Sequence, residues 1–208
     1  MRAPPIGAWR GRVLDVELRA YPLPERLDET DLDELSDAER ARAAGFSALR
    51  RRIEYVTARA HLRRTLGAVL GVTPSTIPLL ADDFGKPQHA GGLQFNLSHS
   101  GRAVLIGWGA RPLGVDVETA QRSARYIGRL KIVADVVAAT SLEAVAAFTL
   151  VEAASKAVGR GIGALKGMTL LGVDAAQHAR FATREGVAIR ATQVALAKDY
   201  VAAVAVVD

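Results

Sequence analysis

Six polar side chains in the middle and later part of the chain are of the types that phosphate chemistry needs. They are Ser98, His99, Asp116, Glu118, Glu152 and Lys156. Carboxylate oxygens suit Mg2+, which binds a few carboxylates together with the phosphate oxygens of a substrate. A lysine beside such a site suits a polyphosphate ligand. The residue types alone therefore predict magnesium-dependent chemistry on a phosphorylated small molecule.

A strand-turn-strand unit must position the first four of these residues. The apolar run from Ala103 to Trp108 separates the Ser-His pair from the two acidic residues. If the segment around Asp116 and Glu118 is a regular strand, both carboxylates point to the same face. Like charges on one face repel, so a sheet avoids this arrangement unless a cation or solvent relieves it. The spacing therefore indicates a cation nearby.

A later helix carries the other two residues. Apolar spacing predicts a helix over Ser141 to Val158, with Ser141 as its N-cap and Gly159 at its end. Glu152 and Lys156 are four residues apart and share one face of this helix. The alternative is an ordinary surface ion pair, worth only about 0.2–0.5 kcal/mol.

Two helices are predicted earlier in the chain. One spans Ser47 to Leu70 and ends at Gly71, and its core stripe consists of Leu62, Leu66, Val69 and Leu70. The other spans Leu32 to Ala44, where Ser36 and Glu39 have the spacing of a capping box.

The remaining segments alternate between strands and loops. Gly11 to Leu18 is predicted as an opening strand, and Thr119 to Lys131 as a basic helix or loop. Four further strands are predicted near the end, at 168–173, 186–190, 192–196 and 200–207. Long helices together with these strands permit an α+β fold.

Composition narrows the class of protein. The 208 residues include no cysteine, so a disulfide framework and a thiolate zinc site are excluded. The first residues have no apolar signal-peptide core, and no apolar run approaches the roughly 20 residues that span a bilayer. We therefore expect a soluble, cytoplasmic protein.

The charge of +5 is unevenly distributed. Residues 25–39 include eight acids and one base, whereas residues 40–64 include eight arginines and one acid. Solvated helix faces explain many such arginines, but the clustering favours a phosphate or an acidic protein surface as partner.

Four motifs in order resemble one enzyme family. They are Gly85-Lys86-Pro87, Phe95-Asn96-Leu97-Ser98-His99-Ser100, Gly114-Val115-Asp116-Val117-Glu118, and the segment from Glu152 to Gly161. This set resembles the 4'-phosphopantetheinyl transferases of the surfactin-synthetase-activating (Sfp) type. The resemblance implies transfer of phosphopantetheine from coenzyme A to a serine of an acyl or peptidyl carrier protein, releasing adenosine 3',5'-bisphosphate.

The resemblance also implies an architecture. It implies two similar α/β halves, residues 1–112 and 113–208, that form a pseudo-dimer within one chain. Coenzyme A would bind in the cleft between the halves. The expected protein is a cytoplasmic monomer with no nucleic-acid or membrane partner, which serves fatty acid, polyketide or nonribosomal peptide biosynthesis.

The resemblance assigns the catalytic and metal-binding roles. Asp116, Glu118 and Glu152 would arrange Mg2+ on the pyrophosphate of coenzyme A. Glu152 would also accept the proton of the carrier serine, directly or through water. Lys156 would steady the pyrophosphate and the leaving phosphate. This agrees with phosphoryl transfer, in which charge neutralisation and positioning matter most.

Other residues would hold coenzyme A. The resemblance places Ser98 and His99 on its phosphates, Lys86 and Pro87 at its nucleotide end, and Arg42 at its 3'-phosphate. The resemblance, aligned there through one helix pattern, adds Arg52 and Arg59 to the basic residues near this ligand. An acidic carrier domain would be steered by a basic surface, for which the candidates are Arg122, Arg125 and Arg129.

Two features depart from the family pattern, and two other functions remain open. Phe148 stands where the family usually has a tryptophan, and the usual Phe-Phe…Glu stretch is not recognisable in 126–142. Both departures concern carrier docking. One alternative is a catalytically weak homologue that binds a carrier protein or coenzyme A. The other is a basic nucleic-acid-binding protein, although aromatics are only 5% and no recognised binding motif is present.

Overall fold

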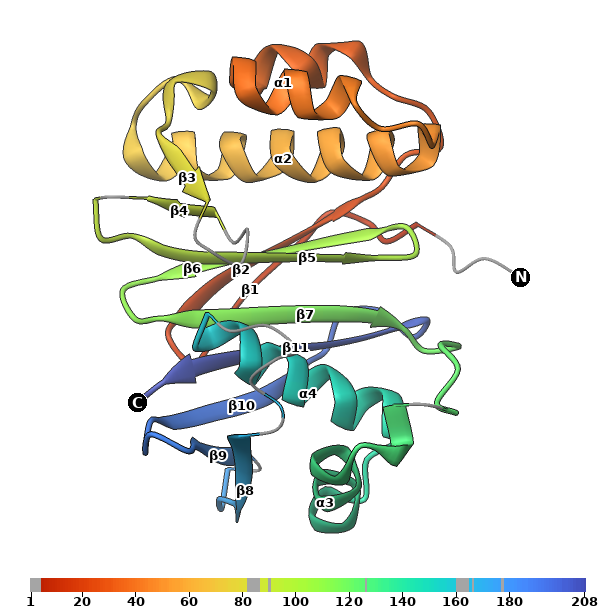
Figure 1. The fold of residues 1–208 in the computed structure, drawn as a ribbon, viewed down its shortest axis with the longest axis vertical. Coiled ribbons are helices and arrows are strands. Elements are labelled where there is room, and N and C mark those ends of the chain that lie inside the picture. Colours follow the sequence, from red (N-terminus) through yellow and green to blue (C-terminus); the bar gives the residue numbers. More distant parts are fainter. Residues whose placement is uncertain are drawn as a thin grey trace.

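The computed structural model describes residues 5–81, 87–89, 91–125, 127–159, 165, 167–176 and 178–208. It shows a mixed α/β protein with antiparallel sheets, as the α+β prediction expects (Figure 1). The first part contains β1 (Trp9–Val13), β2 (Val16–Pro22), α1 (Asp37–Ala44), α2 (Leu49–Leu70), β3 (Leu79–Ala81), β4 (Pro87–His89), β5 (Gln94–Ser100) and β6 (Ala103–Gly109).

The second part contains β7 (Leu113–Thr119), α3 (Lys131–Thr140), α4 (Ala144–Ala157), β8 (Met168–Val173), β9 (Ala179–Thr183), β10 (Ala188–Val194) and β11 (Tyr200–Val207). Short 3-10 helices lie at Glu29–Glu34, Pro74–Thr76 and Ile127–Arg129. β7 is the first strand of this part, and it starts just after the boundary predicted at residue 112. That boundary stays a prediction.

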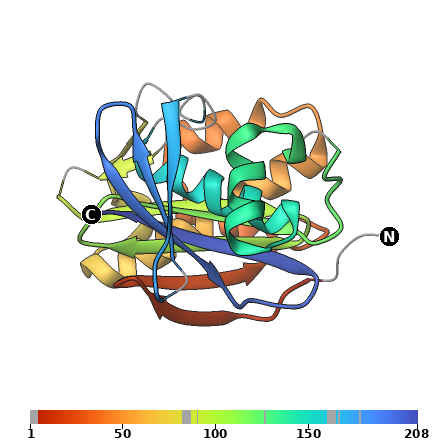
Figure 2. The ribbon, with the colours of Figure 1, turned by 90° about the horizontal axis from the view of Figure 1, so that it is seen from below.

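The two larger sheets are stacked between helices. A four-stranded sheet has the order β1-β2-β6-β5, and a five-stranded sheet has the order β7-β11-β10-β9-β8. Helix α2 covers the first sheet, and α3 and α4 lie together against the second (Figures 1 and 2). The core between the sheets combines Leu18 and Leu105 of the first with Val115 and Val204 of the second. The apolar faces of both sheets are therefore buried against each other.

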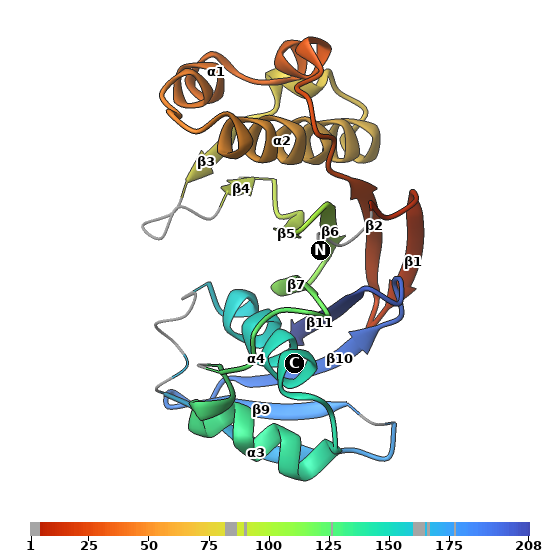
Figure 3. The ribbon, with the colours of Figure 1, turned by 90° about the vertical axis from the view of Figure 1, so that its right-hand side faces the viewer.

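Strands β5 and β7 are edge strands of their sheets and lie side by side at the centre of the molecule (Figure 3). Among the described residues, side chains rather than a backbone ladder connect them. The Val115 backbone N–H donates to Asn96 Oδ1 at 2.9 Å, and further hydrogen bonds join Ser98 to Asp116 and Ser100 to Glu118. The two strands thus run in the same direction. Polar side chains gather along the line where β5 and β7 meet, which we call the seam.

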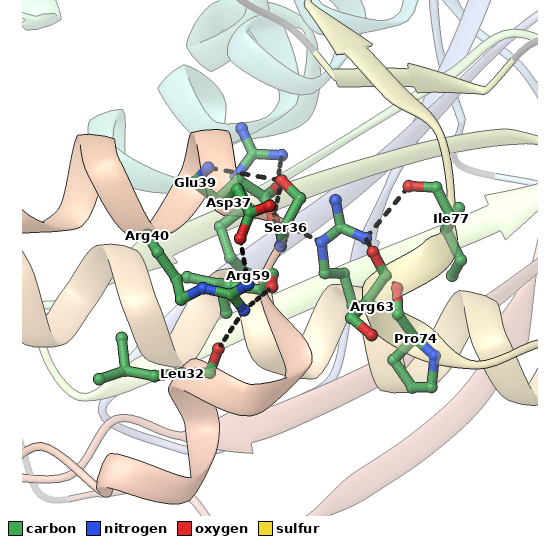
Figure 4. A network of polar contacts seen from close by, with 11 residues as sticks. Leu32, Ser36, Asp37, Glu39, Arg40, Arg59, Arg63, Pro74 and Ile77 are labelled. Atoms are coloured by element: carbon green, nitrogen blue, oxygen red, sulfur yellow. Dashed lines mark hydrogen bonds and ion pairs between the residues drawn. The ribbon is translucent and has the colours of Figure 1, made fainter.

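A buried arginine of α2 joins this helix to α1 and to the segment that follows α2 (Figure 4). Arg63 is only 1% exposed, and its Nε contacts Glu39 Oε2 at 2.5 Å. Its guanidinium also donates to the backbone carbonyls of Pro74, Ser75 and Ile77. Glu39 completes the predicted capping box with Ser36, so that prediction is confirmed. The helix prediction was too long, because α1 begins at Asp37 after a 3-10 turn.

Two predictions near the start of the chain were wrong in detail. The predicted opening strand is a hairpin of β1 and β2, because Leu14 and Asp15 adopt positive φ angles of 51° and 61° at its turn. In α2 the predicted stripe holds for Leu62 and Leu66, which are fully buried, but Val69 is 43% exposed. Gly71 ends this helix in the left-handed conformation, as predicted.

Further corrections concern the second part. Ser141 does not begin α4; it ends α3 with φ 59°, and α3 itself was not predicted. Helix α4 begins at Ala144. The strands predicted at 168–173 and 200–207 are confirmed as β8 and β11. The pair predicted at 186–190 and 192–196 is one strand, β10, and β9 was missed. No single described helix can span a bilayer by length and composition, although α3 and α4 pass that test as a pair bent by 115°.

Candidate functional site

The seam between β5 and β7 contains a buried polar cluster. Alternate residues of each strand point to one face, and on this face Ser98 Oγ donates to Asp116 Oδ1 at 2.8 Å. Ser98 is 8% exposed and Asp116 only 2%. Buried carboxylates are stable only when they are paired and hydrogen-bonded. The cluster must therefore include a cation.

Helix α4 supplies that cation because it lies very close to β7. A Cβ on Gly114 would lie 2.1 Å from the Ala153 carbonyl oxygen and 2.5 Å from the Ala157 nitrogen, so only glycine permits this approach. The approach brings Lys156 Nζ to 2.5 Å from Asp116 Oδ1 and 3.1 Å from Ser98 Oγ. The structure thus brings together Ser98, Asp116 and Lys156, as the sequence predicts.

Glu152 lies one turn earlier on the same face of α4, and its Oε2 is 3.7 Å from Lys156 Nζ. Burial raises the pKa of Glu152, and the charge of Asp116 raises it further, while Lys156 and Arg122 act in the opposite direction. A carboxylate with a raised pKa holds a proton more strongly, which suits a general base. The arrangement can accept a proton at Glu152 beside a fixed ammonium group.

The cluster has an unused ligand atom. Asp116 Oδ2 is buried, and it has no hydrogen-bond partner in the described part of the chain. Such an orphaned oxygen is unusual in a native structure and indicates an absent ion or water. Asp116 and Glu152 are close enough to influence each other's charge. These two carboxylates therefore fit a hard divalent cation that also binds phosphate oxygens.

Glu118 is held differently from the other two carboxylates. Ser100 Oγ donates to its Oε2 at 2.7 Å, and the Arg122 guanidinium forms an ion pair with its Oε1. Within the described residues, no group of three or more histidine, aspartate or glutamate side chains is placed to hold a metal ion. The structure thus brings Asp116 and Glu152 together, and it keeps Glu118 in a pair of its own.

His99 follows Ser98 on β5 and points to the opposite face of the strand. Partial burial lowers its pKa, as do Lys156 and Arg50, while Glu54 opposes them. His99 is therefore largely neutral at pH 7. Its neighbours Arg50 and Glu54 also line a cavity of about 380 Å3 at the start of α2, together with Leu23, Pro24, Glu25, Leu49 and Ile53.

The other predicted ligand-binding residues that the structure describes lie away from the cluster. Pro87 lies beside Phe95 at a small cavity, four residues, or about 13 Å, along β5 from His99. Lys86 lies outside the described residues. Arg42 is exposed on α1, with its guanidinium over the ring of Tyr55.

Most of the arginines of α2 already contact acidic or aromatic side chains of the protein. Arg59 also lies over the Tyr55 ring and is 3.8 Å from Glu39 Oε1. The Nε atom of Arg52 is buried without a partner in the described part of the chain. The roles predicted for these arginines and for Lys86 stay predictions.

Sequence reasoning missed several residues at the seam. Ser100 lies two residues after Ser98 and so on the same face of the strand, which could have indicated its contact with Glu118. Asn96 could have been included by the same alternation. Arg50 and Glu54 gave no signal, because their approach to His99 depends on how α2 packs over β5.

Comparison with known proteins supports one family. No family model matches the chain. The chain is 32% identical over 120 residues to the 4'-phosphopantetheinyl transferase HetI of Nostoc sp. (strain PCC 7120). The aligned stretch covers 51% of this chain and 49% of HetI, so the chain spans about half the length of the curated relative that it matches. This similarity supports the 4'-phosphopantetheinyl transferase family, without distinguishing the Sfp type within it.

Proposed function

We propose that this chain is a 4'-phosphopantetheinyl transferase of the Sfp type. It would transfer phosphopantetheine from coenzyme A to a serine of an acyl or peptidyl carrier protein. The observation that carries the proposal is the buried cluster of Ser98, Asp116 and Lys156 beside Glu152. A fixed ammonium group, an unsatisfied carboxylate oxygen and a carboxylate of raised pKa are what attack by an alcohol on a diphosphate requires.

The chemistry of the proposed reaction can be assigned to these side chains. The serine oxygen of the carrier bonds to the phosphorus that bears the pantetheine group. The bond from that phosphorus to the bridging oxygen breaks, and adenosine 3',5'-bisphosphate leaves with the electron pair. Glu152 accepts the serine proton. Lys156 stabilises the charge on the leaving phosphate.

Asp116 and Glu152, with Glu118 as the third predicted ligand, would hold the divalent cation. A bound Mg2+ supplies positive charge that neutralises the diphosphate. The chain's own groups orient the substrate: Lys156 and Ser98 contact its phosphates from the seam, and neutral His99 can donate one hydrogen bond to an oxygen. The cavity lined by Arg50 and Glu54, whose charges act on His99, is a suitable place for part of coenzyme A.

The predicted pair of related halves, the carrier-binding surface, the location and the oligomeric state belong to the same proposal. Two related halves are supported by the repeated arrangement of one long helix, α2 or α4, on an antiparallel sheet. Arg125 and Arg129 are exposed and remain candidates for binding an acidic carrier. Arg122 is a weaker candidate, because it is paired with Glu118. A cytoplasmic monomer that uses no nucleic acid or membrane completes the proposal.

The test is an incubation of the full chain with coenzyme A, Mg2+ and apo carrier proteins from fatty acid, polyketide and peptide synthesis. Intact mass should show the phosphopantetheinyl gain on at least one carrier, together with release of adenosine 3',5'-bisphosphate. Glu152→Gln should slow transfer by about 10²–10⁴-fold, the usual contribution of a general base. The matched variant Glu143→Gln, on an exposed residue at the start of the same helix, should be as active as the wild type.

The same assay separates the alternatives. A carrier- or coenzyme A-binding homologue without activity would bind these ligands, yet no carrier would gain mass. No gain on any carrier, with the protein folded, would contradict the proposed reaction. Equal rates for the Glu152 and Glu143 variants would remove Glu152 from the role of base.

A further inference from the structure

The ring of Tyr55, on α2, is contacted by guanidinium groups from two helices. The Cζ atom of Arg42, on α1, is 5.3 Å from the centroid of this ring. The Cζ atom of Arg59, one turn further along α2, is 5.6 Å from the same centroid. The ring of Phe46, two residues after α1, lies against Tyr55 with the centroids 5.3 Å apart. Tyr55 therefore brings two cations from separate elements to one place.

The Tyr55 ring has a firm support. It packs against a buried apolar cluster that joins α1 to α2 and consists of Leu35, Ala43, Val56 and Ala60. Attraction between a cation and the face of an aromatic ring offsets the repulsion between two like charges. Without the ring, both arginine side chains would regain the rotamer freedom that this contact removes.

The positive charge at this ring is not balanced by the described residues. Glu39 accepts a hydrogen bond from the Ser36 backbone N–H and pairs with the buried Arg63 (Figure 4). Its other oxygen is 3.8 Å from Arg59, and Arg42 has no acidic partner in the described part of the chain. Two guanidinium groups thus share little negative charge. They suit a phosphate monoester, which carries about two negative charges near pH 7.

A third arginine of α2 lacks an acceptor nearby. Arg52 is three residues before Tyr55 and seven before Arg59, so it lies along the same side of the helix. Its Nε atom is buried, and it has no hydrogen-bond partner among the residues that the structure describes. Because buried N–H groups normally have a partner, this atom indicates an absent acceptor beside the arginines.

We propose that Tyr55 is a positioning residue that holds Arg42 and Arg59 in place for a phosphate monoester. The inference rests on the proposed function, under which this group is the 3'-phosphate of coenzyme A. Guanidinium groups that are ordered before the ligand arrives bind it at a smaller entropic cost, and each can donate two parallel hydrogen bonds to phosphate oxygens. Tyr55 directly follows Glu54, whose charge acts on His99. The arginine pair is therefore near the residues that border the seam.

The test compares coenzyme A with 3'-dephospho-coenzyme A, using calorimetry on the full chain with Mg2+ and without a carrier protein. The wild type should bind coenzyme A at least about tenfold more tightly, as charge-assisted hydrogen bonds to the extra phosphate allow. Tyr55→Leu should reduce this preference about fivefold or more, since two cation–π contacts are lost. Tyr55→Phe retains the ring and should keep the preference within about twofold of the wild type.

The matched control for the tyrosine is Tyr21→Leu. The ring of Tyr21 also packs on α2, where it stacks on His61 with the centroids 4.1 Å apart. No guanidinium group lies over it in the described part of the chain. This variant should therefore leave the preference for the 3'-phosphate unchanged.

Replacing the arginines shows whether Tyr55 acts through them. Arg42→Gln should reduce the preference, whereas Arg51→Gln, on an exposed arginine of α2, should not. When Arg42 and Arg59 are both glutamine, adding Tyr55→Leu should change the preference no further. Circular dichroism checks that each variant is folded. If Tyr55→Leu does not fold, Tyr55→Met takes its place, because methionine fills an irregular space without a ring.

Three outcomes would overturn the inference. They are equal losses for the two ligands in Tyr55→Leu, a Tyr55→Leu effect that persists without the two arginines, and a wild type with no preference for the 3'-phosphate. Failure of the proposed function has a different signature. The preference and its loss in Tyr55→Leu would then be observed, while no carrier protein gains mass in the transfer assay.

Discussion

The ammonium group of Lys156 and the carboxylate of Asp116 depend on each other. Asp116 is 2% exposed, and its partners in the described part of the chain are Lys156 and Ser98. Removing one member of a buried pair leaves an uncompensated charge, which is far more harmful than replacing both. The contribution of this pair to the free energy of unfolding can therefore be measured separately from its role in transfer.

Lys156→Met should therefore lower the free energy of unfolding by about 3–5 kcal/mol. The loss would be measured by urea unfolding at pH 7. Adding Asp116→Asn should restore part of it, because the buried charge is then absent. The control is Lys131→Met, since Lys131 is 88% exposed and pairs with Asp135 on the surface. That change should stay within about 0.5 kcal/mol, and equal losses for the two lysines would contradict the pairing.

The raised pKa of Glu152 has a consequence for stability. Burial and the charge of Asp116 disfavour its ionised form in the folded protein. Below the ordinary pKa of glutamate the group is protonated in both the folded and the unfolded state. As the pH rises through the higher folded-state pKa, the unfolded chain releases the proton first, so the folded state loses stability.

Glu152→Gln should consequently raise the melting temperature at pH 8 relative to the wild type and have a smaller effect at pH 4. Thermal unfolding measured across this range tests the sign, with Glu143→Gln measured beside it as the control variant. A stabilising effect that shrinks as the pH rises would contradict the burial of an unfavourable charge at this position. A gain in stability together with a loss of transfer is the usual trade-off at an active site.

At the scale of elements, the close contact between β7 and α4 sets the position of Lys156. A Cβ on Gly114 would also lie 2.8 Å from Lys156 Cβ, so the helix must move to accommodate any side chain there. The nearest atoms include helix backbone, which cannot rotate away as the end of a flexible side chain can.

Gly114→Ala should thus destabilise the protein by about 1–3 kcal/mol, as overpacking of a core does. It should also weaken transfer, because Lys156 moves with α4. Urea unfolding and the carrier mass assay measure the two effects. Gly7→Ala is the matched control, since a Cβ there meets nothing within 4 Å. Wild-type stability and activity in Gly114→Ala would show that the helix is not held against the strand.

The elements that sequence could predict are those whose signals are local. The capping box at Ser36 and Glu39 and the left-handed end of α2 at Gly71 depend on residues within one turn of a helix. The turn between β1 and β2 lacks the Asn-Gly or Asp-Gly signal that marks such hairpins. Leu14 adopts its positive φ there because the strands on either side pair, which no local pattern records.

In the candidate site, too, the contacts with local signals could be predicted, and those that depend on tertiary packing could not. The two carboxylates on β7 and the Glu152–Lys156 pair follow from strand and helix spacing within one element. The link from Ser98 to Asp116 depends on two edge strands from different sheets lying side by side. Glu118 and Arg122 are four residues apart, but Arg122 lies in the turn after β7, where helical spacing does not apply. Their pairing could not be predicted from the sequence.

At the scale of the whole molecule, the two parts of the chain share one core. Leu18 and Leu105 come from residues before 112, and Val115, Ala202 and Val204 come from residues after it. All five are buried to 1% exposure or less. Burying apolar surface contributes about 25 cal/mol per Å2. Separating the two parts would expose these apolar side chains of both sheets to water. Neither part can therefore bury the apolar face of its sheet alone.

We expect fragments 1–112 and 113–208 to be unfolded or aggregated when each is produced alone, and to form a folded complex when produced together. Co-purification and far-UV circular dichroism test this. In the intact chain, Trp9 and Trp108 report on the first part, whereas circular dichroism reports on both. The two probes should show one coincident unfolding transition. Separate transitions, or a fragment that folds alone, would contradict a shared core and show that the boundary at residue 112 divides independent domains.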